Sequence, residues 1–128
     1  MLQIGTTGRT GQSVNRELVS GGARSHPPYQ EIKFQVVNSN HPITKGVPKN
    51  FDMQDELYRF ENNPNGPDMN VLVKGIEPES GEEFPVVWTV KREGGPIVCF
   101  TFGHDGKAHY HYAYRTILKN SIGWLHNN

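Results

Sequence analysis

The chain has 128 residues, and its 13 Lys and Arg balance its 13 Asp and Glu, which gives a net charge of zero with His counted as neutral. This balance, with no basic run carrying interleaved aromatic residues, argues against a nucleic acid or an acidic membrane surface as partner. The length suits a single domain over residues 1–128, and the longest apolar run is far too short to span a bilayer.

The amino-terminal segment predicts little regular structure. Residues 1–16 are rich in Gly and polar side chains and show no hydrophobic period, which is typical of a loosely docked start. Residues 14–19 predict a short helix that Gly21 and Gly22 end. The segment lacks the apolar region of a secretory signal, so a cytoplasmic location is favoured.

Apolar residues alternate with other side chains over Ile32–Val36, which predicts a strand with one buried face. Two prolines in residues 41–48 exclude a long helix there and favour a short turn. Residues 51–60 mix acidic and aromatic side chains and fit either a strand or a bent loop. Residues 62–67 (NNPNGP) predict a turn.

The next strands are predicted at residues 71–73 and 86–90, and the acidic segment 77–83 between them is interpreted as a solvated loop. The short connection over residues 91–95 indicates an antiparallel hairpin.

The uncharged run Ile97–Phe102, bounded by glycines, is typical of a strand buried on both faces, as in parallel sheets. Cys99 lies inside this run, so we interpret it as an inert core residue. Gly103-His104-Asp105 follows at the carboxyl end of the strand, where open α/β sheets bind ligands.

The carboxyl-terminal segment contains the clearest helix pattern of the chain. From residue 108 onward, apolar and small residues form one stripe at helical spacing over about four turns. The stripe consists of Ala113, Ile117, Ser121 and Trp124, with Tyr114, Leu118, Ile122 and Leu125 beside it.

His104 and Asp105 are the best candidates for chemistry. A histidine can exchange a proton near neutral pH or ligate a metal, and a neighbouring carboxylate can fix its tautomer. The alternative is structural, with Asp105 capping the following helix and His104 packed on the strand end.

A second set of candidates comes from the segment Asp55-Glu56-Leu57-Tyr58. Carboxylates beside a phenol suit proton transfer at, or hydrogen bonding to, a polyhydroxylated ligand. Adjacent carboxylates point apart, so at most one of Asp55 and Glu56 is expected to face a pocket. The alternative is a solvated acidic turn anchored by Tyr58. His41, before a proline, and His26 are further ligand-binding candidates that could equally fix turns.

The histidines also suggest a divalent metal such as zinc. If residues 109 and 111 are helical, they lie about 200° apart around the axis, so both cannot reach one ion. A site made of His104 and His109, with His26 or Glu56, is the remaining arrangement, since zinc accepts mixed nitrogen and oxygen ligands.

Six short motifs in order resemble the ThuA-like (trehalose utilisation) family of the class I glutamine amidotransferase-like superfamily. The resemblance runs from about Glu17 to Leu125. The motifs are Ser25-His26-Pro27, His41-Pro42-Ile43-Thr44-Lys45-Gly46, Asp55-Glu56-Leu57-Tyr58, Pro85-Val86-Val87-Trp88, Gly103-His104-Asp105 and Ile122-Gly123-Trp124.

This resemblance implies an α/β, flavodoxin-like three-layer sandwich and a role in the metabolism of disaccharides or keto-sugars. It favours His104, Asp105, Asp55 and Glu56 as catalytic residues. Tyr58, His41, His26 and Trp88 would bind the sugar-derived substrate. The alternative is a non-catalytic ligand-binding or assembly module that retains the family fold.

The resemblance covers only the carboxyl-terminal part of such a domain, including its β-hairpin and long helix. We therefore expect an amino-terminally truncated form whose exposed apolar face is covered by a missing half or by a second copy in a homo-oligomer. Amidotransfer from glutamine is not expected, because Cys99 lies in mid-strand rather than on a strand-to-helix elbow.

Overall fold

The computed structural model describes residues 2–4, 21–23, 25–62 and 66–128. They form one six-stranded sheet in the order β1-β8-β7-β6-β3-β4 and one two-stranded sheet of β2 and β5. The strands are β1 (Leu2–Ile4), β2 (Gly21–Ala23), β3 (Gln30–Val36), β4 (Asn50–Asp55), β5 (Phe60–Asn62), β6 (Met69–Ile76), β7 (Glu83–Val90) and β8 (Ile97–Phe100). The helices are the 3-10 turn η1 (Pro42–Thr44), α2 (Gly106–Tyr110) and α3 (Tyr112–His126).

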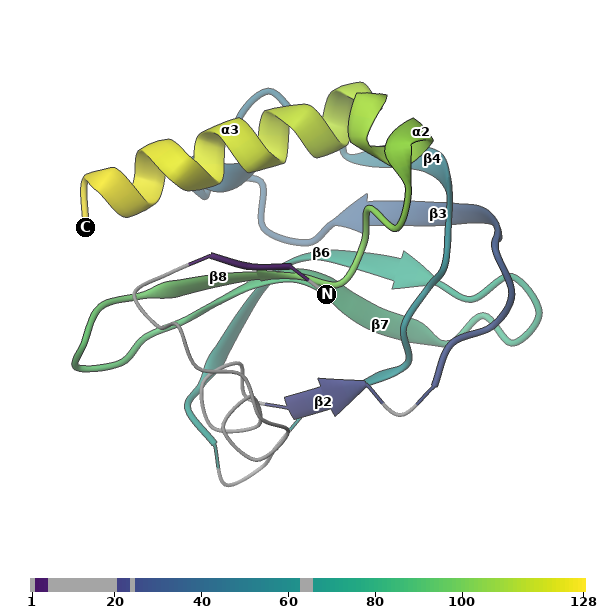
Figure 1. Ribbon diagram of the computed structural model, residues 1–128, viewed down its shortest axis with the longest axis horizontal. Helices are drawn as coiled ribbons and strands as arrows, with labels where there is room; N and C mark the ends of the chain where they lie inside the picture. The colour runs from purple at the N-terminus through teal and green to yellow at the C-terminus, as the bar shows by residue number, and fades with distance from the viewer. Residues whose placement is uncertain (1, 5–20, 24, 63–65) are drawn as a thin grey trace.

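The described elements form three layers. Helix α3 lies across one face of the six-stranded sheet, and β2 lies on the other side of that sheet (Figure 1). Every strand pairing among the described residues is antiparallel. This corrects the association of the apolar run with a parallel sheet. Strand β8 is buried on both faces because α3 covers one face and β5 lies on the side of the other.

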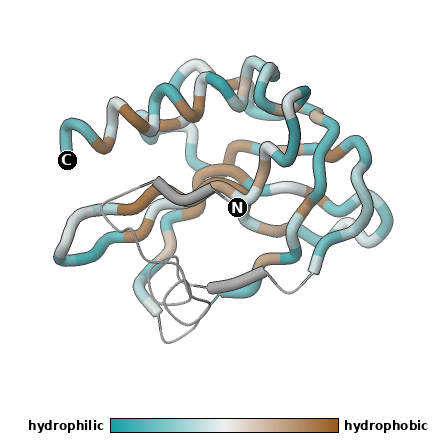
Figure 2. Tube along the Cα trace, viewed as in Figure 1, coloured by the Kyte–Doolittle hydropathy of each residue, from teal (hydrophilic) through white to brown (hydrophobic). Residues whose placement is uncertain are grey.

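The main core fills the space between α3 and the sheet. It includes Phe34 and Phe51, whose rings stack with centroids 5.3 Å apart, and Phe102 packs its edge on Phe34. From α3 it receives Ala113, Tyr114 and Ile117, three members or neighbours of the predicted stripe. The hydropathy colouring shows this apolar character concentrated along the strands and on the inner side of the helix (Figure 2).

A smaller core lies on the opposite face of β7 and β8. Trp88 packs on Phe60 of β5 with ring centroids 4.4 Å apart, and Val90, Ile97 and Cys99 complete the cluster. All of these side chains are at most 4% exposed. The two-stranded sheet therefore closes the second face of the main sheet.

The chain ends differ in part from the sequence predictions. Residues 2–4 are not a frayed start but form β1, which pairs with β8 over Leu2–Ile4. The helix predicted over residues 14–19 lies outside the described residues. The carboxyl-terminal helix is confirmed, but it breaks at His111, which caps α3 by accepting the N–H of Ala113. Among the described residues, no helix has the length and apolar character needed to cross a membrane.

Candidate functional site

The site is built around the turn that follows β8. Gly103 has φ +86°, a conformation that L side chains rarely adopt. A Cβ at this position would also lie 2.2 Å from Cε2 of Tyr114, so a side chain is excluded by space as well as by backbone strain. This turn directs the chain from the buried strand to the surface and leaves the side chain of His104 44% exposed.

The buried carboxylate of Asp55, at the end of β4, fixes this turn. Its Oδ2 accepts the N–H of Gly103 at 2.8 Å, and its Oδ1 accepts the N–H groups of His104 and Glu56 at 2.9 Å each. Burial raises the pKa of Asp55, and the three backbone donors and His104 oppose that shift. Asp55 is fully buried, so its role is to position the His104 backbone rather than to meet a ligand.

Glu56 lies next along the chain, and its carboxylate stands between two imidazoles. Its Oε1 is 3.5 Å from Nε2 of His104, and its Oε2 is 3.4 Å from Nδ1 of His26. The same Nδ1 of His26 lies 3.0 Å from the carbonyl oxygen of Pro27. The side chain of Glu56 is 19% exposed, which keeps the carboxylate accessible from the surface. At most one of the two adjacent carboxylates was expected to face a pocket; in the structure Asp55 is fully buried and Glu56 is partly exposed.

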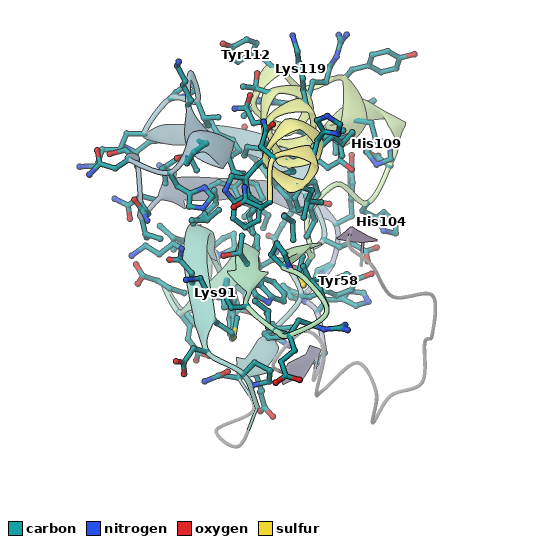
Figure 3. The ribbon with its side chains drawn as sticks, turned by 90° about the vertical axis from the view of Figure 1, so that its left-hand side faces the viewer. Tyr58, Lys91, His104, His109, Tyr112 and Lys119 are labelled. Atoms are coloured by element: carbon teal, nitrogen blue, oxygen red, sulfur yellow. The ribbon has the colours of Figure 1, made fainter. Side chains whose placement is uncertain are left out.

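A cavity of about 230 Å³ opens beside His104. Tyr58 forms part of its wall and packs edge-on against the ring of His26 with centroids 5.4 Å apart. On the other side, His109 stacks on Tyr114 with centroids 4.8 Å apart, and its Nε2 lies 2.7 Å from the carbonyl oxygen of Gly103. Figure 3 shows Tyr58, His104 and His109 on one flank of the molecule. Of the two predicted segments, Tyr58, Gly103 and His104 line this cavity, whereas Asp55, Glu56 and Asp105 lie beside it.

Asp105 has mainly a structural function in this geometry. Its Oδ1 accepts the N–H of Ala108 at 3.0 Å and caps α2, while its Oδ2 accepts the hydroxyl of Tyr29 at 2.7 Å. These hydrogen bonds lower the pKa of Asp105, and the bond to Asp105 raises the pKa of Tyr29. Asp105 therefore caps the following helix, as the structural alternative predicted.

Three of the four predicted ligand-binding residues do not line this cavity, and one of them, His26, borders another cavity together with Arg59 and Glu77. Trp88 is 0% exposed within the smaller core, so the structure places it away from the cavity. His41 caps η1 by accepting the N–H of Ile43 and borders a different cavity, next to Trp124. Burial lowers the pKa of His41.

The proposed metal ligands His104 and His109 both border the cavity, but one nitrogen of His109 already meets the carbonyl of Gly103. Among the residues that the structure describes, no group of three or more His, Cys, Asp or Glu side chains is arranged to hold a metal ion. The geometry thus adds no support to the zinc hypothesis. The assumption that residues 109 and 111 lie in one helix is also wrong, because His111 stands at the break between α2 and α3.

Sequence reasoning missed two aromatic contributors to the site. Tyr29 lies with its ring centroid 6.4 Å from that of His104, and Tyr114 was assigned only to the helix stripe. The position of Tyr29 directly after two prolines, in a segment held rigid, was the available signal. Nothing in the spacing of Gly103 and Tyr114 indicated that they touch.

Comparison with known proteins supports the family resemblance found from the sequence motifs. The model of the family described as "ThuA: Trehalose utilisation" matches residues 5–125. The match begins at residue 5 rather than near Glu17, so it extends further toward the amino terminus than the resemblance found from the motifs. No protein with a curated description matches the chain.

Two solved structures resemble the chain, each with a TM-score of 0.69. A ThuA-like protein from Parabacteroides merdae is 26% identical, and the match covers 81% of this chain and 40% of that one. A ThuA-like protein from Bacteroides uniformis is 22% identical, and the match covers 87% of this chain and 49% of that one. The chain therefore spans less than half the length of these structures.

Proposed function

Because the chain belongs to the ThuA (trehalose utilisation) family, we propose that it acts on or binds a sugar-derived ligand, a disaccharide or keto-sugar, in the cavity beside His104. The observation that carries the proposal is the contact between Glu56 and His104 at the edge of that cavity. A carboxylate beside an imidazole fixes its tautomer and ring orientation, which suits proton transfer at a sugar hydroxyl or carbonyl.

In this proposal each residue has a separate task. His104 exchanges the proton, and Glu56 orients its ring. Tyr58 offers an aromatic face and a hydroxyl at the cavity wall. Asp55 holds the backbone that carries His104, and Asp105 caps α2 behind it.

We further propose that this chain represents part of a flavodoxin-like three-layer domain. The support is the TM-score of 0.69 to two ThuA-like structures, of which the chain spans 40% and 49%. Glutamine amidotransfer does not belong to the proposal. Cys99 is fully buried, and burial raises the pKa of its thiol to about 12, which leaves no nucleophilic thiolate.

A non-catalytic module is the second candidate. Two of the three predicted catalytic carboxylates, Asp55 and Asp105, accept backbone hydrogen bonds, which favours a site that binds without turnover. Self-association also stays a proposal. Its support is the outer face of α3, where Tyr112 and Ile122 are 62% and 57% exposed. Light scattering of wild type and Ile122→Glu tests it: a monomeric wild type contradicts self-association.

The functional test compares wild type, His104→Ala, Glu56→Gln and the control His126→Ala, which removes an exposed histidine at the end of α3. Turnover of trehalose and 3-keto-disaccharides is followed by chromatography, and binding by calorimetry. Loss of turnover in His104→Ala and Glu56→Gln, with turnover kept in His126→Ala, supports the catalytic proposal. Binding by wild type without turnover supports the module. An unchanged rate in His104→Ala removes His104 from the mechanism.

A further inference from the structure

A second polar and aromatic hollow lies at the opposite end of β8 from His104. Two cavities, of about 320 and 440 Å³, share Trp124 and Lys91. Lys91 belongs to the turn between β7 and β8, whereas His104 follows the other end of β8. Neither cavity shares a lining residue with the cavity beside His104. Figure 3 shows Lys91 apart from the flank that carries Tyr58 and His104.

Two adjacent cations border the larger cavity. Within the part of the chain that the structure describes, neither Lys91 nor Arg92 forms a salt bridge. The Nη1 of Arg92 is shielded from solvent and has no hydrogen-bond partner among the described residues. A guanidinium is always charged, and a buried charged donor without an acceptor is unfavourable. An oxyanion bound beside Lys91 and Arg92 would neutralise their charge.

The neighbouring groups suit a sugar ring. Trp124 is partly buried against the main core, and its indole borders both cavities. Asp68 and Asn70 border the smaller cavity and offer side-chain oxygens and an amide to hydroxyl groups. The ring of His41 lies 5.1 Å from that of Trp124. Because its Nδ1 accepts the N–H of Ile43, the neutral ring carries its proton on Nε2 as a donor.

Charge also orients the ligand. Asp68 borders only the smaller cavity, Arg92 borders only the larger one and Lys91 borders both, so an anionic group is attracted more strongly to the larger cavity. Asn128, on the larger cavity, already donates its amide to the carbonyl oxygen of Trp124.

We infer that this hollow is a second ligand site, which binds a carbohydrate carrying a phosphate or carboxylate group. The oxyanion lies at Lys91 and Arg92, the sugar ring lies on the indole of Trp124, and the hydroxyl groups face Asp68 and Asn70. The inference does not depend on the function proposed for the His104 cavity.

The test is a titration with glucose 6-phosphate, glucuronate, glucose and inorganic phosphate, each followed by the indole N–H resonance of Trp124 in ¹H–¹⁵N spectra. The Trp124→Phe variant assigns the resonance. The charge-removal variant is Lys91→Gln with Arg92→Gln. Its matched control is Arg115→Gln with Lys119→Gln, which removes the same two charges from the outer face of α3.

We expect saturable shifts with at least one anionic sugar and weaker binding of glucose. Charge removal at residues 91 and 92 should raise the Kd about tenfold or more, the effect of losing one charged hydrogen bond. The control pair and His104→Ala should leave the Kd within about twofold. The two anionic probes distinguish a phosphate from a carboxylate requirement.

Three results would overturn the inference: no saturable shift with either anionic sugar, equal weakening in the control pair, or phosphate binding as tightly as glucose 6-phosphate, which indicates an adventitious ion only. If the double variant does not fold, Lys91→Gln alone must still weaken binding, and its failure to do so counts against the site. If His104→Ala loses turnover but still binds the anionic sugar at Lys91 and Arg92, the second site is independent of the site proposed at His104.

Discussion

The buried carboxylate of Asp55 provides the sharpest test of how the site is held. In Asp55→Asn, one carboxylate oxygen becomes an NH₂ group. If the amide oxygen takes the place of Oδ1, it still accepts the N–H groups of His104 and Glu56. The NH₂ group then faces the N–H of Gly103, whose present acceptor is Oδ2 at 2.8 Å. Two donors confront each other in a fully buried position.

The expected magnitude follows from these contacts. Each buried donor left without an acceptor costs about 1–3 kcal/mol. The substitution also removes a buried charge, and this offsets part of the lost free energy, because burial raises the pKa of Asp55 and so disfavours its charged form. We expect a net loss of about 2 kcal/mol in the free energy of unfolding, which lowers the Tm by about 10 °C for a chain of this size. Urea unfolding followed by circular dichroism measures it.

Asp52→Asn is the matched control, because Asp52 lies on the same strand with its side chain exposed. A surface substitution of this kind stays within about 0.5 kcal/mol of wild type. If Asp55→Asn is no less stable than Asp52→Asn, the carboxylate does not hold the turn and the positioning argument is wrong.

The pH dependence gives an independent check. The folded pKa of Asp55 is raised above its ordinary 3.8, so the folded state binds the proton more tightly. Its contribution to stability is fully present below that value and is lost as the pH rises through the folded pKa. The Asn variant lacks this titration. The stability difference between wild type and Asp55→Asn should therefore shrink as the pH rises, and a difference that grows with pH would contradict the assigned direction.

Three further predictions follow from the same region. Gly103→Ala should lose at least about 2 kcal/mol more than Gly81→Ala in urea unfolding, because both glycines have positive φ but only position 103 adds a clash with Tyr114; equal losses would exclude the clash. Asp105→Ala should be less stable than wild type at neutral pH, and because the pKa of Asp105 is lowered from 3.8, the difference should disappear as unfolding is measured in more acid solution. Cys99 should react with a thiol reagent only at the rate of unfolding, since it is fully buried with a pKa of about 12, and rapid labelling of the native protein would contradict its burial.

The hydrophobic pattern predicted the strands, and the short turn predicted the antiparallel hairpin of β7 and β8, but the association of the apolar run with a parallel sheet was wrong. The segments 32–36, 86–90 and 97–100 are strands, and β8 is buried on both faces as its composition indicates. An apolar run indicates that both faces of a strand are covered, but it does not indicate which elements cover them. Here α3 and the small sheet with β5 cover an antiparallel sheet, which produces the same sequence signal as a parallel one.

Charged residues were harder to place, because their environment is set by distant partners. The segment 77–83 was interpreted as solvated, yet Glu77 is only 7% exposed and pairs with Arg59 eighteen positions earlier. Ser80 also donates to that carboxylate. No local pattern encodes a partner at that separation, so sequence alone could not distinguish a buried ion pair from an exposed acidic loop.

The neighbouring carboxylates at the end of β4 explain why the site could be predicted only in part. Asp55 ends β4 and is buried, whereas Glu56, the first residue after the strand, reaches the ring of His104. The inward carboxylate sets the backbone of His104 while the outward one contacts its ring. The imidazole is therefore fixed from the main chain and from the side chain by two adjacent residues. Sequence reasoning could foresee that the two carboxylates diverge, but assigning their tasks required knowing which face of β4 meets the turn after β8.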